Sequence, residues 1–367
     1  MGLRCGIVGL PNVGKSTLFN SLSNAKAESA NYPFCTIEPN VGIITVPDDR
    51  LRILEEIVNP ERVVPTIVEF VDIAGLVKGA SQGEGLGNKF LANIREVDAI
   101  IHVVRCFDDP NIIHVAGKVD PVADKDIIDT ELQLKDLESV DKKISKTERT
   151  AKNGDAKAKK ELASLLRYKL HLEEGKNARS LEPHLTDDEK EAVADLLLLT
   201  AKPVIYAANV DEASITSGNQ WVEALKAHVV LENAQVVVVC AAIEEQIADM
   251  EEPEEKEMFL SEYGLTESGL NRLIRASYDI LNLITYFTAG VKEVRAWTVH
   301  RGDKAPAAAG VIHSDFEKGF IRAEVIKLAD YQQYKSEVKI KEAGKMAVEG
   351  KEYVVQDGDI MHFRFNV

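Results

Sequence analysis

Residues 9–16 read Gly-Leu-Pro-Asn-Val-Gly-Lys-Ser, and this stretch decides the fold. It matches the pattern of a phosphate-binding loop, Gly-x-x-x-x-Gly-Lys-Ser/Thr, at every fixed position. Apolar residues 3–10 predict a strand before the loop, and residues 16–22 predict a helix after it. The glycines let successive backbone N–H groups turn inward around anionic oxygens, and the helix N-terminus adds partial positive charge. The stretch therefore predicts a nucleoside triphosphate site.

The side chains of this loop have expected partners on the nucleotide. Lys15 is expected to reach the β- and γ-phosphates, which makes it a candidate catalytic residue, and the Ser16 hydroxyl is expected to hold Mg²⁺. The predicted nucleotide contacts of the loop and of the first helical turn are Asn12, Val13, Gly14, Lys15, Ser16 and Thr17.

A second phosphate-site motif follows a predicted strand at residues 67–71, where residues 72–75 read Asp-Ile-Ala-Gly. Asp72 is expected to hold Mg²⁺ through water, and the N–H group of Gly75 is expected to sense the γ-phosphate. Thr36 lies in a polar stretch twenty residues beyond Ser16. Because Mg²⁺ favours oxygen ligands, we expect the hydroxyl of Thr36 to be a further metal ligand.

The composition is that of a globular chain and excludes several classes of protein. The 367 residues suffice for two or three domains, and the net charge of −16 argues against a general polyanion binder. No apolar run approaches the roughly 18 residues of a membrane span. The four cysteines are widely separated and form no C-x-x-C pair, and no signal peptide is recognised, so a cytoplasmic protein is expected.

The periodicity of apolar residues changes along the chain, and these changes indicate domain boundaries. Between residues 124 and 200, leucine and isoleucine recur at helical spacing, which predicts a coiled-coil-like hairpin. Strand patterns resume at residues 204–208 and 236–240, so this hairpin is predicted to be an insertion. We expect a nucleotide-binding domain of residues 1–283 that is interrupted by the insertion at 124–200, and a small mixed β domain of residues 284–367, with one strand at 352–355.

The two phosphate-site motifs and Thr36, in this order, resemble a GTPase domain of the translation-factor class. That resemblance implies an α/β fold with a doubly wound, mostly parallel sheet. Residues 31–42, 72–90 and 355–360 narrow the resemblance to the Obg-like ATPase family, also called YchF, and the similarity runs through essentially the whole chain. It implies a nucleotide domain interrupted by a coiled-coil arm and followed by a TGS domain, which is a ubiquitin-like β-grasp module.

The segment that reads the base departs from the GTPase pattern. GTPases use Asn-Lys-x-Asp after the fifth strand, whereas residues 209–212 read Asn-Val-Asp-Glu. Val210 replaces the lysine that stacks on the base, and Glu212 is longer than the aspartate that accepts from guanine. A buried carboxylate facing the wrong edge costs roughly a few kcal/mol, so we expect ATP to be preferred over GTP, as the family resemblance also implies. The predicted base-pocket residues are Asn209, Val210, Glu212 and Ala241.

These features predict a molecular switch that hydrolyses ATP. Two alternatives stay open at this point: a GTPase of the same fold, and a nucleotide-gated binding module whose hydrolysis is incidental. Binding of ATP and GTP to one preparation separates the GTPase from the ATPase, and single-turnover and steady-state rates test the binding module.

The group that positions the attacking water needs a separate prediction. Many GTPases carry a glutamine after Asp-x-x-Gly for this purpose, and here the residue is Leu76, which cannot hydrogen-bond. His114 is a candidate because it follows a predicted strand at 99–104 and imidazole exchanges protons near neutral pH; a histidine packed at the base of a loop is the alternative. Related NTPases without the glutamine use an asparagine at the position of Asn12 to hold K⁺, so K⁺ stays open beside a structural role.

Residues 142–160 contain eight Lys+Arg against two Asp+Glu, a net charge of +6 in an otherwise acidic chain. They place positive charge at the tip of the predicted hairpin, where it can neutralise phosphates, although a solvated helix tip is the alternative. The TGS resemblance favours RNA, and the family implies ribosome association. We therefore expect a monomer that binds ATP and the ribosome or its RNA through the TGS domain and the basic arm, and that binds no membrane.

Overall fold

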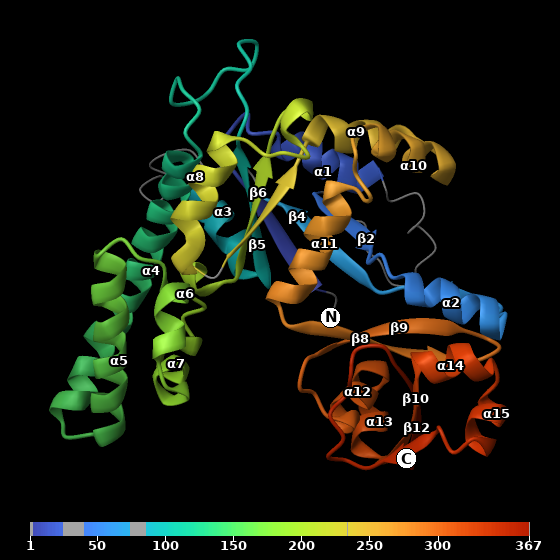
Figure 1. Ribbon diagram of the computed structural model, residues 1–367. Coiled ribbons are helices and arrows are strands. Elements are labelled where there is room, and N and C mark those ends of the chain that lie inside the picture. The colour runs from blue at the N-terminus through green and yellow to red at the C-terminus, as the bar shows by residue number, and fades with distance from the viewer. Residues whose placement is uncertain (1–2, 25–39, 74–85, 233, 367) are drawn as a thin grey trace. The chain divides into compact units, whose positions relative to one another are not determined.

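The computed structural model describes residues 3–24, 40–73, 86–232 and 234–366 (Figure 1). Its contacts divide the chain into two compact units. The first unit, which we call the nucleotide unit, contains residues 1–44 and 69–276. The second, the C-terminal unit, contains residues 45–68 and 277–367. Among the described residues, no helix is both long and apolar enough to cross a membrane.

The nucleotide unit is built on a six-stranded sheet with the order β2-β4-β1-β5-β6-β7. Neighbouring strands β1, β5, β6 and β7 are parallel. Every residue of β5 and β6 is buried, which accounts for the mostly apolar sequences of these strands. The strands are β1 (Leu3–Val8), β2 (Val41–Thr45), β4 (Ile67–Asp72), β5 (Ala99–Arg105), β6 (Val204–Asn209) and β7 (Gln235–Val239).

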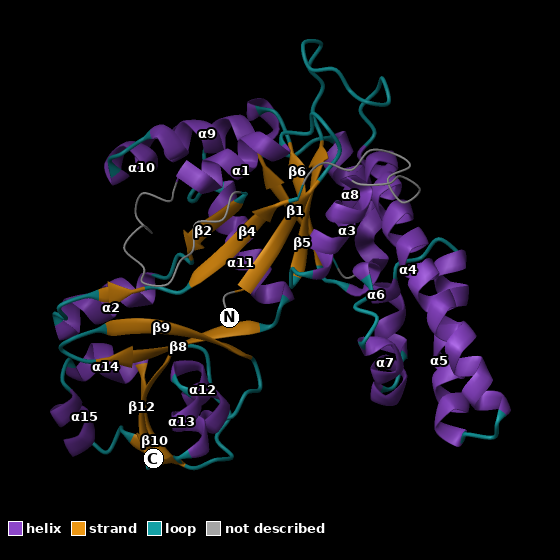
Figure 2. Cartoon of the chain, turned by 180° about the vertical axis from the view of Figure 1, so that it is seen from behind, coloured by secondary structure: helices purple, strands orange, loops and turns teal. Residues whose placement is uncertain are grey.

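Helices cover both faces of this sheet, with α1 and α11 on one face and α3, α4 and α8 on the other (Figures 1 and 2). The strand order reverses direction at β1, which lies between β4 and β5. Open α/β sheets bind ligands outside the carboxyl ends of the strands at such a reversal. The helices are α1 (Lys15–Asn24), α3 (Leu86–Arg95), α4 (Pro121–Lys152), α8 (Gln220–Val229), α9 (Ala241–Asp249), α10 (Pro253–Glu262) and α11 (Gly269–Ile280).

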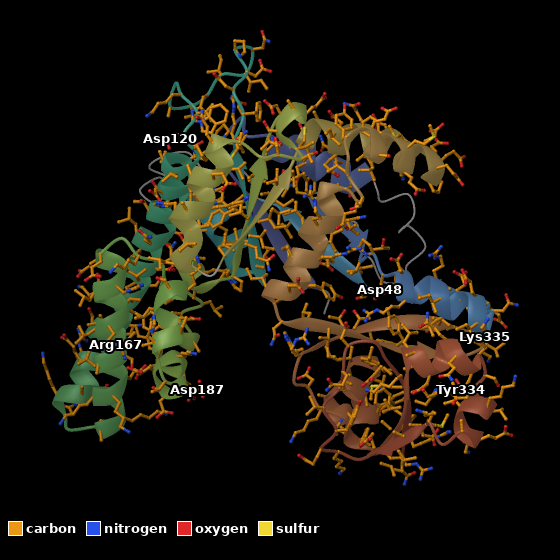
Figure 3. All side chains as sticks on the ribbon, viewed as in Figure 1. Asp48, Asp120, Arg167, Asp187, Tyr334 and Lys335 are labelled. Atoms are coloured by element: carbon orange, nitrogen blue, oxygen red, sulfur yellow. The ribbon has the colours of Figure 1, made fainter. Side chains whose placement is uncertain are left out.

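A helical insertion separates β5 from β6 in the chain. Helix α4 begins at Pro121, where the Asp120 side chain caps it by accepting the N–H of Ala123 at 3.1 Å (Figure 3). Helix α5 (Ala156–Glu173) returns along α4 after a turn in which Gly154 has φ +93°, a conformation that favours glycine. The short helices α6 (Ala178–Leu181) and α7 (Asp187–Ala194) complete the insertion, and their apolar side chains share one core with α4 and α5.

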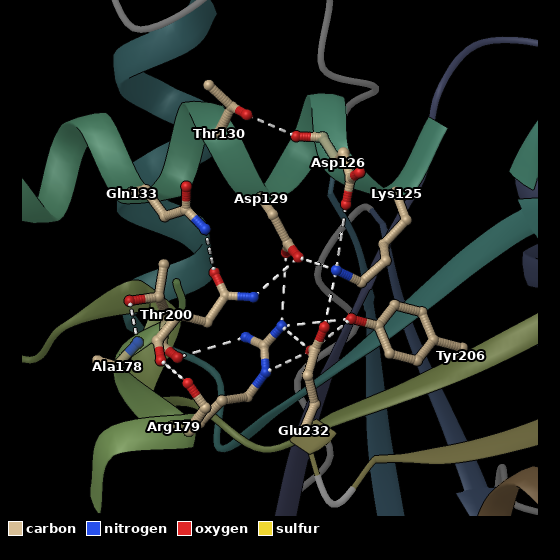
Figure 4. A network of polar contacts seen from close by, with 12 residues as sticks. Lys125, Asp126, Asp129, Thr130, Gln133, Ala178, Arg179, Thr200, Tyr206 and Glu232 are labelled. Atoms are coloured by element: carbon tan, nitrogen blue, oxygen red, sulfur yellow. Dashed lines mark hydrogen bonds and ion pairs between the residues drawn. The ribbon is translucent and has the colours of Figure 1, made fainter. Parts of the chain in front are cut away.

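A buried ionic cluster joins the base of this insertion to the sheet (Figure 4). Lys125 of α4 contacts Asp129 at 2.6 Å and Glu232 at 2.7 Å. Arg179 of α6 contacts Glu232 at 2.7 Å, and the hydroxyl of Tyr206 on β6 donates to the same carboxylate at 2.9 Å. Burial alone would lower the pKa of Arg179, but Asp129, Tyr206 and Glu232 raise it. The two cations and two carboxylates therefore stabilise one another inside the protein.

The C-terminal unit contains a mixed six-stranded sheet with the order β11-β10-β12-β8-β9-β3. Strands β8 and β9 form an antiparallel pair, β12 runs parallel to β8, and β10 lies antiparallel to both β11 and β12. The elements of this unit are α2 (Asp49–Val58), β3 (Val63–Val64), β8 (Leu283–Ala289), β9 (Val294–His300), α12 (Ala305–Ile312), α13 (Ser314–Lys318), β10 (Phe320–Lys327), α14 (Leu328–Tyr334), α15 (Glu337–Glu342), β11 (Ala347–Glu349) and β12 (Asp359–Phe365).

Residues 45–68 belong to the C-terminal unit, although the sequence analysis assigns them to the nucleotide domain. Helix α2 buries Leu51 and Leu54 in a core shared with Phe287 and Ile360. Strand β3 pairs in parallel with β9. The guanidinium of Arg50 contacts the Asp357 carboxylate at 2.9 Å. Contacts with residues far away in the sequence therefore place residues 45–68 in the C-terminal unit.

The predicted strand at residues 352–355 is wrong. The segment has a turn in which the Tyr353 N–H donates to Gly350, and a single bridge joins Val354 to Lys304. The strand at this edge of the C-terminal sheet is instead β11, which comes earlier in the chain and pairs with β10. The alternating pattern arises because Val355 is buried beside exposed neighbours in an irregular segment.

Candidate functional site

The phosphate-binding loop lies between β1 and α1, at the point where the strand order reverses. Gly14 has φ +90°, and a Cβ atom at this position would lie 2.2 Å from the side-chain nitrogen of Asn209. A Cβ atom at Gly9 would lie 2.8 Å from the carbonyl oxygen of Val103 on β5. Both glycines are therefore required by close approach, and Gly14 is required by its backbone angle as well. Asn12 also has positive φ, at 65°.

Asn209 connects three segments at the carboxyl edge of the sheet. Its side-chain nitrogen donates to the carbonyl of Val13 at 2.9 Å, and its side-chain oxygen accepts the N–H of Ala241 at 2.9 Å. The residue is only 3% exposed. One side chain thus ties the phosphate-binding loop, the end of β6 and the start of α9 together, which places the predicted contacts Val13, Asn209 and Ala241 side by side.

Lys15 and Asp72 meet although 57 residues separate them in the sequence. The Lys15 ammonium forms an ion pair with the Asp72 carboxylate at the end of β4. Ser16 and Thr17 lie in the first turn of α1, where the Ser16 side chain is exposed. Thr36 and Gly75, which the sequence analysis assigns to the metal and the γ-phosphate, lie outside the described residues.

The residues present at this edge fit a hydrated Mg²⁺ ion. The Asp72 carboxylate lies at the end of β4 beside the Lys15 ammonium and is 21% exposed, so water bound to a cation can reach it. The hydroxyl of Ser16 is accessible on the neighbouring helical turn. Oxygen donors of this kind, with several retained waters and phosphate oxygens, are what Mg²⁺ prefers.

The predicted base-reading segment divides into a buried and an exposed part. Val210 is 2% exposed and its N–H donates to Val239 at 2.8 Å. Glu212 begins a short 3₁₀ turn, η4 (Glu212–Ser214), and its side chain faces solvent. The Asp211 carboxylate caps this turn by accepting the N–H of Ser214 at 3.0 Å. The carboxylate at the substituted position is therefore exposed and not buried as expected, and its Oε2 accepts from the Tyr263 hydroxyl at 3.4 Å.

His114 lies in the loop between β5 and α4, next to the phosphate-binding loop. The side-chain nitrogen of Asn12 donates to the carbonyl of Ile113 at 3.1 Å. The His114 Nδ1 accepts the N–H of Ala116 at 3.1 Å, so its Nε2 carries the proton and donates to Asp124 at 2.9 Å. The side chains of His114 and Asp124 are 7% and 2% exposed. The imidazole is therefore held in one tautomer by the first turn of α4.

Sequence reasoning missed two residues that shape this loop. Burial raises the pKa of Asp124, while the hydrogen bond from His114 acts in the opposite direction. Arg105, which is 1% exposed, donates to the carbonyls of Phe107 and Ile112 at 3.1 and 3.0 Å. An arginine at the end of a strand of mostly apolar residues is the signal that could have pointed to this anchor.

Two family models match separate parts of the chain. Residues 4–160 match a family model described as 50S ribosome-binding GTPase. Residues 283–366 match a model for the C-terminal part of YchF proteins, described as a protein of unknown function. The chain is similar over its whole length and theirs to proteins named ribosome-binding ATPase YchF, with 58% identity to that of Bacillus subtilis and 56% to that of Escherichia coli O157:H7.

Solved structures agree with these matches. The structure of the Schizosaccharomyces pombe YchF GTPase superimposes with a TM-score of 0.89 at 40% identity, covering 99% of this chain and 98% of that one. A GTP-binding protein from Pyrococcus horikoshii OT3 superimposes with a TM-score of 0.60 at 22% identity, covering 99% of this chain and 100% of that one, and shows a shared fold.

Proposed function

The chain belongs to the YchF family, and from this premise we propose that it is a P-loop ATPase that hydrolyses ATP to ADP and phosphate and binds the ribosome. One observation supports the ATPase assignment above the others. Asn209 joins the phosphate-binding loop to the segment that reads the base in GTPases. In this chain, that segment has Val210 and Glu212 in place of the residues that read guanine. The family resemblance inferred from the sequence is confirmed.

The proposed mechanism begins with the ion pair between Lys15 and Asp72. An arriving triphosphate competes with Asp72 for the Lys15 ammonium, which then neutralises charge on the β- and γ-phosphates. The backbone N–H groups around Gly14 would donate to the same oxygens. Mg²⁺ held through Ser16, Thr36 and water on Asp72 would neutralise further charge that develops on the phosphates. K⁺ beside Asn12 is a further part of the proposal.

Steady-state hydrolysis and equilibrium binding of ATP and GTP to the full chain test this function. We expect ATP to bind more tightly and to be hydrolysed faster, because Glu212 is longer than the aspartate that accepts from guanine and so places its carboxylate differently. Equal or tighter binding of GTP would favour the GTPase alternative. Phosphate release that stays at the buffer rate, with and without ribosomes, would favour a nucleotide-gated binding module.

We propose His114 as the group that positions the attacking water, which requires the ring to exchange its contact with Asp124 for one with the water, because both ring nitrogens are engaged and the side chain is 7% exposed. These contacts support the alternative, a histidine packed at the base of the loop. Replacing His114 by alanine is expected to lower kcat for ATP about 100-fold with little change in ATP affinity, because only a transition-state interaction is lost. The matched control is His228→Ala, which removes a partly exposed imidazole of the same unit. If both variants keep the original kcat, the water is positioned by backbone, K⁺ or a partner.

We also propose the finer organisation that the resemblance implies: a coiled-coil arm at residues 124–200 and a TGS domain at residues 284–367. The parallel pairing of β12 with β8, beside the antiparallel β8–β9 pair, supports a β-grasp module. The hairpin of α4 and α5 supports the arm, with exposed Lys146 and Arg149 near its tip. We propose further that the protein is a cytoplasmic monomer that binds the ribosome.

Charge reversal at the arm tip tests whether the protein binds the ribosome through the arm. The variant Lys146→Glu/Arg149→Glu is expected to weaken ribosome cosedimentation about tenfold and to make its salt dependence shallower, because fewer phosphates are neutralised. Lys143 is left unchanged because it already contacts Glu161 at 2.9 Å.

The control variant, Lys118→Glu/Lys226→Glu, reverses the same amount of charge at exposed positions outside the arm. Equal effects of the two variants would mean that overall charge, and not the arm, governs the association.

A further inference from the structure

We propose that Tyr263 is a specificity-determining residue of the base site, where it fixes the Glu212 carboxylate so that the site accepts adenine and rejects guanine. This inference rests on the proposed ATPase function. Tyr263 belongs to none of the motifs in the sequence, and it reaches the site from the segment between α10 and α11.

The contact between the two residues spans 51 positions of the chain. The Tyr263 hydroxyl donates to Oε2 of Glu212 at 3.4 Å. The hydroxyl is the donor because an ionised carboxylate can only accept. Partial burial and the neighbouring Glu212 carboxylate raise the pKa of the Tyr263 hydroxyl in addition. One carboxylate oxygen is thereby engaged, and Oε1 is left to meet a ligand.

The position of the Tyr263 ring is itself fixed from two sides. Its carbonyl accepts the Thr216 hydroxyl at 2.9 Å, in the segment that follows η4, and its N–H donates to Leu260 at 3.1 Å. The ring packs against Phe259 with the centroids 5.2 Å apart. A hydroxyl on a ring held in this way restrains the carboxylate that it contacts.

Tyr263 also lies beside the other wall of the base pocket. Burial raises the pKa of the Cys240 thiol, and the nearby Glu212 carboxylate raises it further. Cys240 is followed by Ala241, whose N–H binds Asn209. The Tyr263–Glu212 pair therefore lies at the edge where β6 and β7 end, which is where the base is proposed to bind.

The chemistry of the two purines makes a fixed carboxylate selective. Adenine presents an N6 amino donor at the position where guanine presents the O6 acceptor. A restrained carboxylate oxygen accepts from the adenine amino group and repels the guanine oxygen. A carboxylate that can rotate is able to turn toward the N–H donors of guanine, and this reduces the discrimination.

Tyr263→Phe removes the hydroxyl and keeps the ring. We expect the ratio of the GTP to the ATP dissociation constant to fall about fivefold to tenfold, as is typical for losing one hydrogen bond at an exposed position. The measurement is equilibrium titration of the full chain with each nucleotide at the same Mg²⁺ concentration. In a Glu212→Gln background, the same change is expected to leave the ratio unaltered, because no carboxylate remains to be restrained.

Tyr331→Phe is the matched control, since the Tyr331 hydroxyl contacts the Glu337 carboxylate at 3.2 Å in the C-terminal unit. This variant is expected to keep the original ratio. An equal loss of affinity for both nucleotides in Tyr263→Phe, or the same change of ratio in both backgrounds, would overturn the inference. An unmodified chain without any preference for ATP would instead contradict the proposed function, so the two failures are distinguishable.

Discussion

Replacing Lys15 by alanine is expected to lower kcat for ATP about 10³-fold, because the variant loses the positive charge that stabilises the transferred phosphoryl group. The effect on the fold is expected to be small. The Lys15 side chain is 10% exposed and its partner Asp72 is 21% exposed, so water reaches the carboxylate that is left behind. Steady-state phosphate release and the thermal midpoint of the same preparation measure both effects.

Lys118→Ala is the matched control for this experiment, because it removes an exposed ammonium that pairs with Asp120 at 3.5 Å outside the phosphate site. The control is expected to keep kcat within about twofold. If Lys15→Ala hydrolyses ATP at the original rate, the assignment of the phosphate site is refuted, because no other lysine of the motif can replace it.

Replacing Arg179 by alanine is expected to lower the free energy of unfolding of the nucleotide unit by about 3–5 kcal/mol. The variant leaves the buried carboxylates of Asp129 and Glu232 with Lys125 as their remaining cation in the described cluster. It also frees the carbonyl of Thr200, which accepts from Arg179 at 3.3 Å. The variant is destabilised because negative charge stays buried without a sufficient partner, in addition to the attraction that is lost.

Urea unfolding followed by Trp221 fluorescence measures this effect, since Trp221 lies on α8 of the same unit and a Trp297→Phe background removes the second tryptophan. The control is Arg167→Ala, whose side chain is 46% exposed and pairs with Glu189 on α7 of the same insertion (Figure 3). We expect the control to cost less than about 1 kcal/mol. Similar costs for the two variants would show that the buried cluster does not stabilise the unit. Arg179→Lys should fall between them because it keeps the charge without the planar fork.

The position of the phosphate-binding loop was predictable because its requirements are local. Gly14 needs positive φ, Lys15 follows it directly, and the loop must join a strand to a helix. Each requirement acts on neighbouring residues, so a single stretch records them all. The family was predictable for the same reason, since residues 31–42, 72–90 and 355–360 are short continuous segments.

Side-chain partners that lie far apart in the chain were not predictable. The contact of Asn209 with Val13 joins residues 196 positions apart, and that of Arg50 with Asp357 joins residues 307 positions apart. Nothing in the local pattern of α2 shows that Leu51 and Leu54 pack in the core of the C-terminal unit. An amphipathic helix indicates that it needs an apolar partner without indicating which one.

By itself, the amino-acid sequence determined that this protein carries a P-loop, that its base segment departs from the guanine-reading pattern, and that the chain belongs to one family. These properties depend on residue type and on spacing along the backbone. Only the tertiary structure decided that Asp124 holds His114, that Arg179 completes a buried ionic cluster, and that Tyr263 contacts Glu212. Hydrogen bonds and ion pairs act over a few ångströms in space, whatever the separation in sequence, so the fold alone selects which polar groups become partners.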